Sequence, residues 1–146
     1  MIIPTKITIS EAEWEIMRVV WAHQTVTSRE VIDTLDNKMN WKQSTIKTLI
    51  GRLVEKEALK TEKDGRKFLY SANISENETV RSFSEDILGR VCQKDNGRVI
   101  QQLVEKSVLS QEDIEQLIIQ LQDKLINAPV EVPCECAPGQ CDCHVA

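Results

Sequence analysis

Four cysteines lie close together near the C-terminal end of this 146-residue chain, with the spacing C-x-C-x-x-x-x-C-x-C. Thiolates are soft ligands that select Zn(II) and Cu(I), and the central Pro138-Gly139 turn allows the two pairs to converge on one site. Paired C-x-C spacing favours a compact thiolate cluster over a zinc ribbon, which usually has C-x-x-C knuckles. The pattern predicts a metal site made of Cys134, Cys136, Cys141 and Cys143.

Two further residues, Cys92 and His144, have side chains that could bind a metal. Cys92 lies near an apolar helical stripe, so we expect it to pack as a small buried side chain. His144 adjoins the cysteines, but four thiolates already complete a tetrahedral shell, so we expect an exposed tail residue. Disulfides are the alternative for the tail. Residues 1–6 do not resemble a secretory signal, and the expected cytoplasmic location keeps thiols reduced.

The segment from Lys42 to Arg52 is rich in polar and basic side chains, as is typical of a helix that reads DNA. Glutamine can pair with adenine, threonine methyls suit the thymine methyl group, and lysine or arginine holds phosphates. A hairpin tip rich in basic residues follows, where it would reach flanking phosphate. The alternative is a solvated polar helix face. The predicted DNA-binding residues are Lys42, Gln43, Ser44, Thr45, Lys47, Thr48, Arg52, Lys63, Arg66 and Lys67.

The net charge of -5 combines two halves of opposite sign. Residues 1–75 hold 12 Lys and Arg against 10 Asp and Glu, whereas residues 76–146 hold 6 against 13. Binding to nucleic acid needs a basic face and not a basic whole, so the acidic total does not exclude it. No apolar run is long enough for a membrane span, and the residues show no Ser/His/Asp or Cys/His constellation, so we expect neither a membrane protein nor an enzyme.

Hydrophobic periodicity and capping motifs predict three helices in residues 1–74. The capping box Ser10 to Glu13 opens a helix over about residues 10–23, Thr27 to Glu30 opens a second, and a third runs from about Lys42 to Lys56. An Asp64-Gly65 pair then predicts a hairpin over residues 59–70 with a type I′ turn. Three helices followed by a hairpin is the order of a winged helix-turn-helix domain, so the fold class is mainly α with a small β-hairpin.

Residues 75–128 are predicted to form a helical dimerisation domain, followed by the cysteine-rich tail over residues 129–146. Ser75 caps a helix, Asn96-Gly97 interrupts the chain before a short helix around residues 99–106, and Ser110 caps a last helix. About fifty helical residues are too few for an independent core, so we expect a homodimer. The predicted dimerisation residues are Phe83, Ile87, Val91, Ile114, Leu117, Ile118, Leu121 and Leu125.

Three segments carry a resemblance to a known family: Ala12–Trp21, Val26–Val31 and Trp41–Val54. They are similar to the BlaI/MecI/CopY repressors of bacteria, and the similarity runs from about residue 8 to 126. The resemblance implies a dimeric winged-helix repressor that binds inverted-repeat operators on double-stranded DNA. One departure is Glu57-Ala58, where relatives often have Lys-Gly, so the turn before the wing is expected to differ.

The tail resembles that of the CopY branch, which implies a copper-responsive repressor of copper-homeostasis genes. The resemblance implies Zn(II) in the DNA-bound form and its replacement by two Cu(I) ions. A copper chaperone that delivers Cu(I) is a further candidate partner. Four thiolates with one Zn(II) or with two Cu(I) both carry a charge of minus two, so geometry must carry the signal. The alternatives are a β-lactam-type repressor inactivated by proteolysis, disfavoured because the chain has no Asn-Phe bond, and a copper-storage protein.

Overall fold

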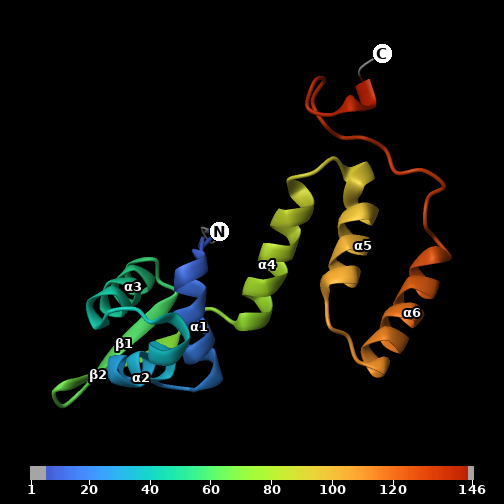
Figure 1. The fold of residues 1–146 in the computed structure, drawn as a ribbon. Coiled ribbons are helices and arrows are strands. Elements are labelled where there is room, and N and C mark those ends of the chain that lie inside the picture. Colours follow the sequence, from blue (N-terminus) through green and yellow to red (C-terminus); the bar gives the residue numbers. More distant parts are fainter. Residues whose placement is uncertain (1–5, 145–146) are drawn as a thin grey trace, which may run out of the picture. The chain divides into compact units, whose positions relative to one another are not determined.

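The structure, a computed structural model, describes residues 6–144 and divides into two units, Met1–Val80 and Arg81–Ala146. The first unit contains α1, α2, α3, β1 and β2, and the helix α4 begins in it (Figure 1). The second contains the rest of α4 and the helices η1, α5, α6 and η2. No helix among residues 6–144 is both long and apolar enough to cross a bilayer.

The three helices of the first unit are α1 (Glu11–Ala22), α2 (Ser28–Met39) and α3 (Gln43–Glu55). The predicted capping box at α1 is confirmed: the Ser10 hydroxyl accepts from the Glu13 N–H, and the Glu13 carboxylate accepts from the Ser10 N–H. Thr27 caps α2 at its start, and Asn40, the cap residue after its C-terminal end, takes the left-handed conformation. Local capping chemistry therefore sets the bounds of α1 and α2.

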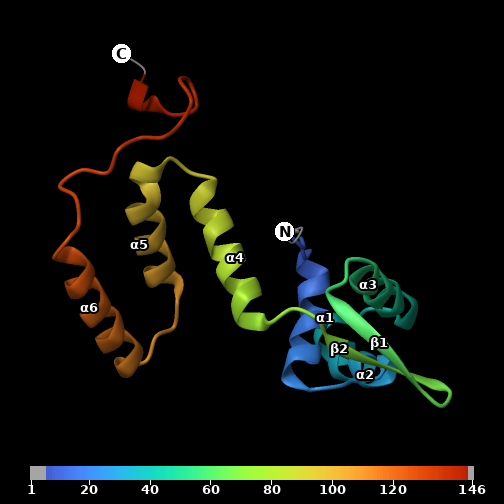
Figure 2. The same cartoon turned by 180° about the vertical axis from the view of Figure 1, so that it is seen from behind.

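The hairpin pairs β1 (Leu59–Asp64) with β2 (Lys67–Ala72) in antiparallel register, with Asp64 opposite Lys67. The predicted type I′ turn is wrong, because the two turn residues are Gly65 and Arg66 and only Gly65 has a positive φ. A positive φ confined to the first central residue is typical of a type II′ turn, where glycine is favoured. Figures 1 and 2 show the turn at the projecting end of the hairpin.

An isolated bridge between Val26 and Tyr70 joins the hairpin to the loop between α1 and α2. The Tyr70 N–H donates to the Val26 carbonyl at 2.7 Å, and the Val26 N–H donates to the Tyr70 carbonyl at 3.0 Å. The Trp21 indole N–H also donates to the carbonyl of Ile74, beyond the hairpin, at 3.0 Å. These bonds fix the wing against the helices that carry it.

The turn between α3 and β1 contains Glu57 in the left-handed region, with a φ of 65°. The Asn73 amide donates to the Glu57 carbonyl at 2.9 Å, and the next residue, Ala58, is completely buried. A left-handed conformation strains a side chain with a Cβ and suits glycine. The strained residue of the Glu57-Ala58 pair is therefore Glu57, one position before the residue that is glycine in the Lys-Gly pair expected of relatives.

The apolar core lies in the first unit, where α1, α2, α3 and the start of β1 meet. Every buried hydrophobic residue in the described part of the chain falls between residues 16 and 59. Fully buried members include Ile16 and Met17 of α1 and Ile46 and Leu53 of α3. Helical periodicity predicts this core because residues three and four positions apart share a face.

Glu13 is a charged residue within this core, with 2% of its surface exposed. Its carboxylate accepts from the Lys56 ammonium at 2.6 Å, which links α1 to the residue that follows α3. Burial acts to raise the pKa of Glu13, but hydrogen bonds from Lys56 and Ser10 outweigh it and lower the pKa. From the sequence, Glu13 is predicted only as part of the capping box, because Lys56 lies 43 residues away.

The helices of the second half are α4 (Glu76–Gly89), η1 (Gln93–Asp95), α5 (Asn96–Lys106), α6 (Gln111–Leu125) and η2 (Asp142–His144). Capping by Ser75 and Ser110 is confirmed. One detail is corrected: Asn96-Gly97 begin α5 and do not interrupt the chain before it, and Val91, a predicted dimerisation residue, lies beyond the end of α4. No residue of α4, α5 or α6 is buried among those described, so the second half has no core within one chain.

We expect Glu13→Gln to lower the free energy of unfolding by about 1–2 kcal/mol at neutral pH, because it removes a charged hydrogen-bond partner of Lys56. The lowered pKa of Glu13 stabilises the fold above the pKa of the unfolded state, near 4.5, and this stability is lost as pH falls through the folded pKa. Urea unfolding of both proteins from about pH 7 down to about pH 3 checks this.

Glu11→Gln is the matched control, because Glu11 is an exposed carboxylate in the same first turn of α1. The difference between wild type and Glu13→Gln should shrink on acidification, whereas Glu11→Gln should stay close to wild type throughout. An unchanged midpoint for Glu13→Gln at neutral pH would show that the ion pair does not stabilise the fold.

Candidate DNA interface and thiolate cluster

One face of α3 carries the polar residues predicted to read DNA, and its other face enters the core. Ile46, Leu49, Ile50 and Leu53 are buried, which fixes the rotation of the helix about its axis. The side chains between them are therefore directed outward. All seven predicted residues of this segment are exposed: Lys42, Gln43, Ser44, Thr45, Lys47, Thr48 and Arg52.

The N-terminus of α3 differs from those of α1, α2 and α6. Those three helices have a side-chain cap and acidic residues in their first turn, whereas α3 has Lys42 at the cap position, no side-chain cap and no first-turn acid. Uncapped amides at a helix N-terminus bind phosphate, and a nearby lysine adds positive charge. This end of α3 is thus suited to an anionic partner.

The hairpin tip supplies further positive charge. Arg66 lies in the turn, Lys67 opens β2, and Lys63 lies one position before the end of β1. All three are exposed, and within residues 6–144 none of the six basic side chains predicted to bind DNA forms an ion pair. Their charge is therefore available to an external partner.

The second unit brings cysteines together. The sulfurs of Cys92, Cys134, Cys136 and Cys141 all lie within 4.8 Å of one another. The Sγ–Sγ distance is 3.4 Å between Cys134 and Cys141 and 3.7 Å between Cys92 and Cys134. The predicted ligand Cys143 lies outside this group of four but has its sulfur 3.8 Å from that of Cys92. Three of the predicted ligands thus meet at one point with a fourth thiol from outside the tail.

The geometry of these sulfurs fits a tetrahedral thiolate site. Zn–S bonds of about 2.3 Å in a tetrahedron place the sulfurs about 3.8 Å apart. The observed distances of 3.4 and 3.7 Å are close to that value. All five cysteines are free thiols, so none is withheld from a metal by a disulfide.

The thiols have different proton affinities. Partial burial and hydrogen bonds with neighbouring thiols raise the pKa of Cys136 to about 12. Hydrogen bonding with Cys141 and Cys92 raises the pKa of Cys143 to about 12, whereas the backbone N–H of Cys143 and the Cys134 thiol lower the pKa of Cys141. A metal must displace protons from such a cluster, so its affinity falls as pH falls.

The prediction that Cys92 packs as a buried side chain is wrong, and its position beside the tail thiols is not predicted from the sequence. Cys92 lies after the end of α4, at the cap position of η1, and is only half-buried beside the tail sulfurs. The sequence signal was weak because Cys92 stands alone, 42 residues before Cys134. The prediction for His144 falls on a side chain outside the part of the chain that the structure describes.

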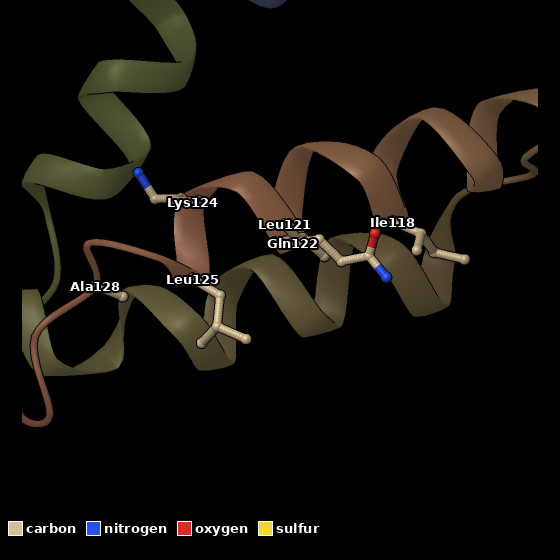
Figure 3. Close-up of a pocket in the computed structure, with 6 residues that line it drawn as sticks. All are labelled: Ile118, Leu121, Gln122, Lys124, Leu125 and Ala128. Atoms are coloured by element: carbon tan, nitrogen blue, oxygen red, sulfur yellow. The ribbon is translucent and has the colours of Figure 1, made fainter.

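An apolar face runs along α6. Ile118, Leu121 and Leu125 line an open hollow together with Gln122, Lys124 and Ala128, and Figure 3 shows Lys124 pointing away from Leu125. The predicted dimerisation residues are either exposed or half-buried: Phe83, Ile114, Ile118, Leu121 and Leu125 are exposed, and Ile87, Val91 and Leu117 are half-buried. None of them is fully covered by its own chain.

Comparison with known proteins identifies the family. The family model for penicillinase repressors matches residues 9–123. The chain belongs to the penicillinase repressor family. This confirms the resemblance to BlaI/MecI/CopY proteins, which are DNA-binding transcriptional repressors and not enzymes. The match ends before the cysteine tail. Family membership therefore supports the repressor function and gives no evidence for a bound metal.

Curated relatives of this penicillinase repressor family member include a 16.5 kDa protein from the ptsI 3′ region of Latilactobacillus sakei, 45% identical and covering 93% of both chains. The penicillinase repressor of Bacillus licheniformis is 36% identical and covers 75% of this chain and 85% of its own. The methicillin resistance regulatory protein MecI of Staphylococcus aureus is 31% identical over an alignment that covers 75% of this chain and 89% of MecI.

Solved structures of repressors also resemble about half of the chain. BlaI of Bacillus licheniformis, in complex with the blaP half-operator, is 43% identical and covers 50% of this chain and 90% of its own, with a TM-score of 0.45. The CopR repressor is 41% identical over 47% of this chain and 99% of its own, with a TM-score of 0.41.

We expect Lys42→Ala to weaken DNA binding similarly for all sequences. The slope of log affinity against log salt should become shallower by about one for each phosphate that the variant no longer neutralises. Lys42 lies at the uncapped N-terminus of α3, where binding of phosphate is favoured. Fluorescence anisotropy with labelled DNA over a series of salt concentrations measures both effects.

Lys106→Ala is the matched control, because Lys106 is an exposed lysine in the last turn of α5, in the other unit. It should leave affinity and salt slope unchanged. If Lys42→Ala and Lys106→Ala behaved alike, the assignment of α3 as the reading helix would be wrong.

Proposed function

We propose that this repressor responds to copper and controls copper-homeostasis genes, with a zinc-loaded dimer on an inverted-repeat operator and Cu(I) as the inducer. The observation that carries the proposal is the convergence of four cysteine sulfurs within 4.8 Å in the second unit. The DNA-reading part rests on family membership and on the exposed basic residues of α3 and the hairpin.

The donor set selects the metal. Thiolates bind Cu(I) and Zn(II) in preference to hard cations such as magnesium or calcium. Zn(II) would be held tetrahedrally by four of the five thiols and would add folding free energy to a segment with little regular structure. Cu(I) is softer and can share bridging thiolates, which favours its entry into the same sulfur cluster.

The exchange of Zn(II) for Cu(I) must release DNA through a change in the coordination geometry of the thiolate site. One Zn(II) or two Cu(I) ions with four thiolates leave the same net charge, so electrostatic repulsion of the DNA does not change. The tail between residues 129 and 146 contains only the short helix η2 among its described residues, and its conformation is therefore set by the metal. A different metal geometry alters where the tail holds the rest of the second unit.

Dimerisation supplies the burial that the second unit lacks within one chain. Ile118, Leu121 and Leu125 leave 49%, 59% and 73% of their surface exposed, and no described residue of α4, α5 or α6 is buried. Burial of apolar area stabilises by about 25 cal/mol per Å². We propose that the apolar face of α6 is covered by the same face of a second copy of the chain, because a symmetric operator is bound by a two-fold symmetric dimer.

We expect Leu121→Glu to shift the protein from dimer to monomer, because a charge placed in the apolar face of α6 loses its hydration on association. Analytical ultracentrifugation measures the association state. Operator affinity should fall with it, because a monomer contacts one half-site only.

Gln116→Glu adds the same charge to an exposed position on the same helix, away from the apolar face, and should remain dimeric. A dimeric Leu121→Glu variant would rule out this face as the interface.

The second candidate is a β-lactam-responsive repressor. The names of the Bacillus licheniformis and Staphylococcus aureus relatives favour it. Such a repressor needs neither a thiolate cluster nor copper, and it would hold DNA when Cu(I) is added. A copper-storage protein, the remaining alternative, would bind Cu(I) and not DNA.

The decisive experiment uses zinc-loaded protein on a labelled genomic fragment that the protein itself selects. We expect anaerobic addition of Cu(I) to release the wild type. A Cys134→Ser/Cys136→Ser variant should not respond to Cu(I), because the metal site has lost two ligands. Release of that variant as readily as wild type would disprove the tail mechanism, and no release of wild type would favour the β-lactam alternative.

A further inference from the structure

We propose that Cys92 is a ligand of the tail metal site and completes the Zn(II) shell with Cys134, Cys136 and Cys141, while Cys143 remains outside it. The proposal rests on the metal-binding function proposed above and deepens it, because it assigns a ligand from outside the C-x-C-x-x-x-x-C-x-C segment. Its evidence is the position of one sulfur relative to the others and the structure of the turn that carries it.

The distances favour Cys92 over Cys143. The Cys92 sulfur lies 3.7 Å from that of Cys134 and within 4.8 Å of those of Cys136 and Cys141. Cys143 is exposed, and although its sulfur lies 3.8 Å from that of Cys92, it does not belong to the group whose four sulfurs are all mutually within 4.8 Å. A tetrahedral site takes four thiolates, so the mutually close group is the shell and the fifth thiol is in excess.

The backbone around Cys92 holds it in place. Cys92 is the cap residue of η1, and its carbonyl accepts from the Asp95 N–H at 2.8 Å. It therefore projects from an ordered turn between α4 and α5, whereas the other ligands come from the irregular tail. A hollow lined by Lys94 of the same turn and by Pro133, Cys134 and Cys143 of the tail independently shows that these two segments meet.

A ligand at position 92 changes what the metal controls. The metal would close a loop from Cys92 to Cys134 that contains η1, α5 and α6, and so would include the apolar face of α6. Closing a loop of this length removes conformational entropy from the open form. The metal then acts on the helices of the proposed dimer interface.

Alkylation of the unmodified chain tests the ligand set without a mutation. Zinc-loaded and metal-free protein are treated with iodoacetamide, and each cysteine is mapped by mass spectrometry. We expect zinc to slow labelling of Cys92, Cys134, Cys136 and Cys141 by more than about tenfold, since bound thiolates are withheld from the reagent, and to leave Cys143 reactive. Equal labelling of Cys92 with and without zinc would overturn the proposal.

Cobalt(II) spectroscopy of variants provides a second readout, because Co(II) substitutes for Zn(II) and its sulfur charge-transfer absorption grows with each bound thiolate. We expect Cys92→Ser to lose part of this absorption and to bind Co(II) more than about tenfold more weakly. Cys143→Ser, the matched control, should resemble wild type. Circular dichroism checks that both variants keep their helices.

The results distinguish the assignment of Cys92 as a ligand from the proposed metal-responsive function on which it rests. If wild type binds Co(II) and Cys92→Ser gives the same spectrum and affinity, Cys92 is not a ligand, but a tail metal site remains. If wild type itself binds neither Co(II) nor Zn(II), the metal-responsive function fails as well. A weakened Cys92→Ser together with an intact Cys143→Ser supports the shell assigned here.

Discussion

Apolar burial within a single chain ends at residue 59 among the described residues, and most features of this protein depend on that limit. The buried side chains come from α1, α2, α3 and the start of β1, and they form a core that fixes α3 and the hairpin relative to each other. The helices that follow leave their apolar side chains exposed, Leu125 most plainly among those of α6. One part of the chain is stable by its own packing, and we propose that the other draws its stability from a second copy and from a metal.

That division suits a repressor. Reading DNA needs a rigid surface, and the first unit provides one because the inner face of α3 is locked into the core while its outer face stays polar. Response to a signal needs an element whose stability is low enough for a ligand to change it. A helical segment without its own core, followed by a tail that carries thiols, has this property. The opposite net charges of the two halves are consistent with one facing phosphate and the other a protein.

The sulfur cluster is the physical link between the tail and the helices of the second unit. A tail that bound metal only through its own cysteines would change its own shape and little else. The sulfur of Cys92 lies on the turn between α4 and α5, 3.7 Å from that of Cys134, and so places the helical segment against the tail thiols. Differential binding of two metals can shift a conformational equilibrium only through interactions that differ between the states. Under the proposed ligand set, thiols from two separate segments would provide such interactions.

Local chemistry in the sequence determined the helices, the wing and the exposed polar face of α3. Capping by Ser10 and Ser110, helical periodicity and the Asp64-Gly65 pair act over a few residues, so they can be read directly from the chain. Only the tertiary structure decided that Glu13 pairs with Lys56 and that Cys92 joins the tail thiols, because those partners lie 43 and 42 residues apart. The II′ turn and the early start of α5 also needed coordinates, since glycine and asparagine permit several backbone conformations. Short-range interactions leave a pattern in sequence, whereas long-range pairings depend on how the chain folds back on itself.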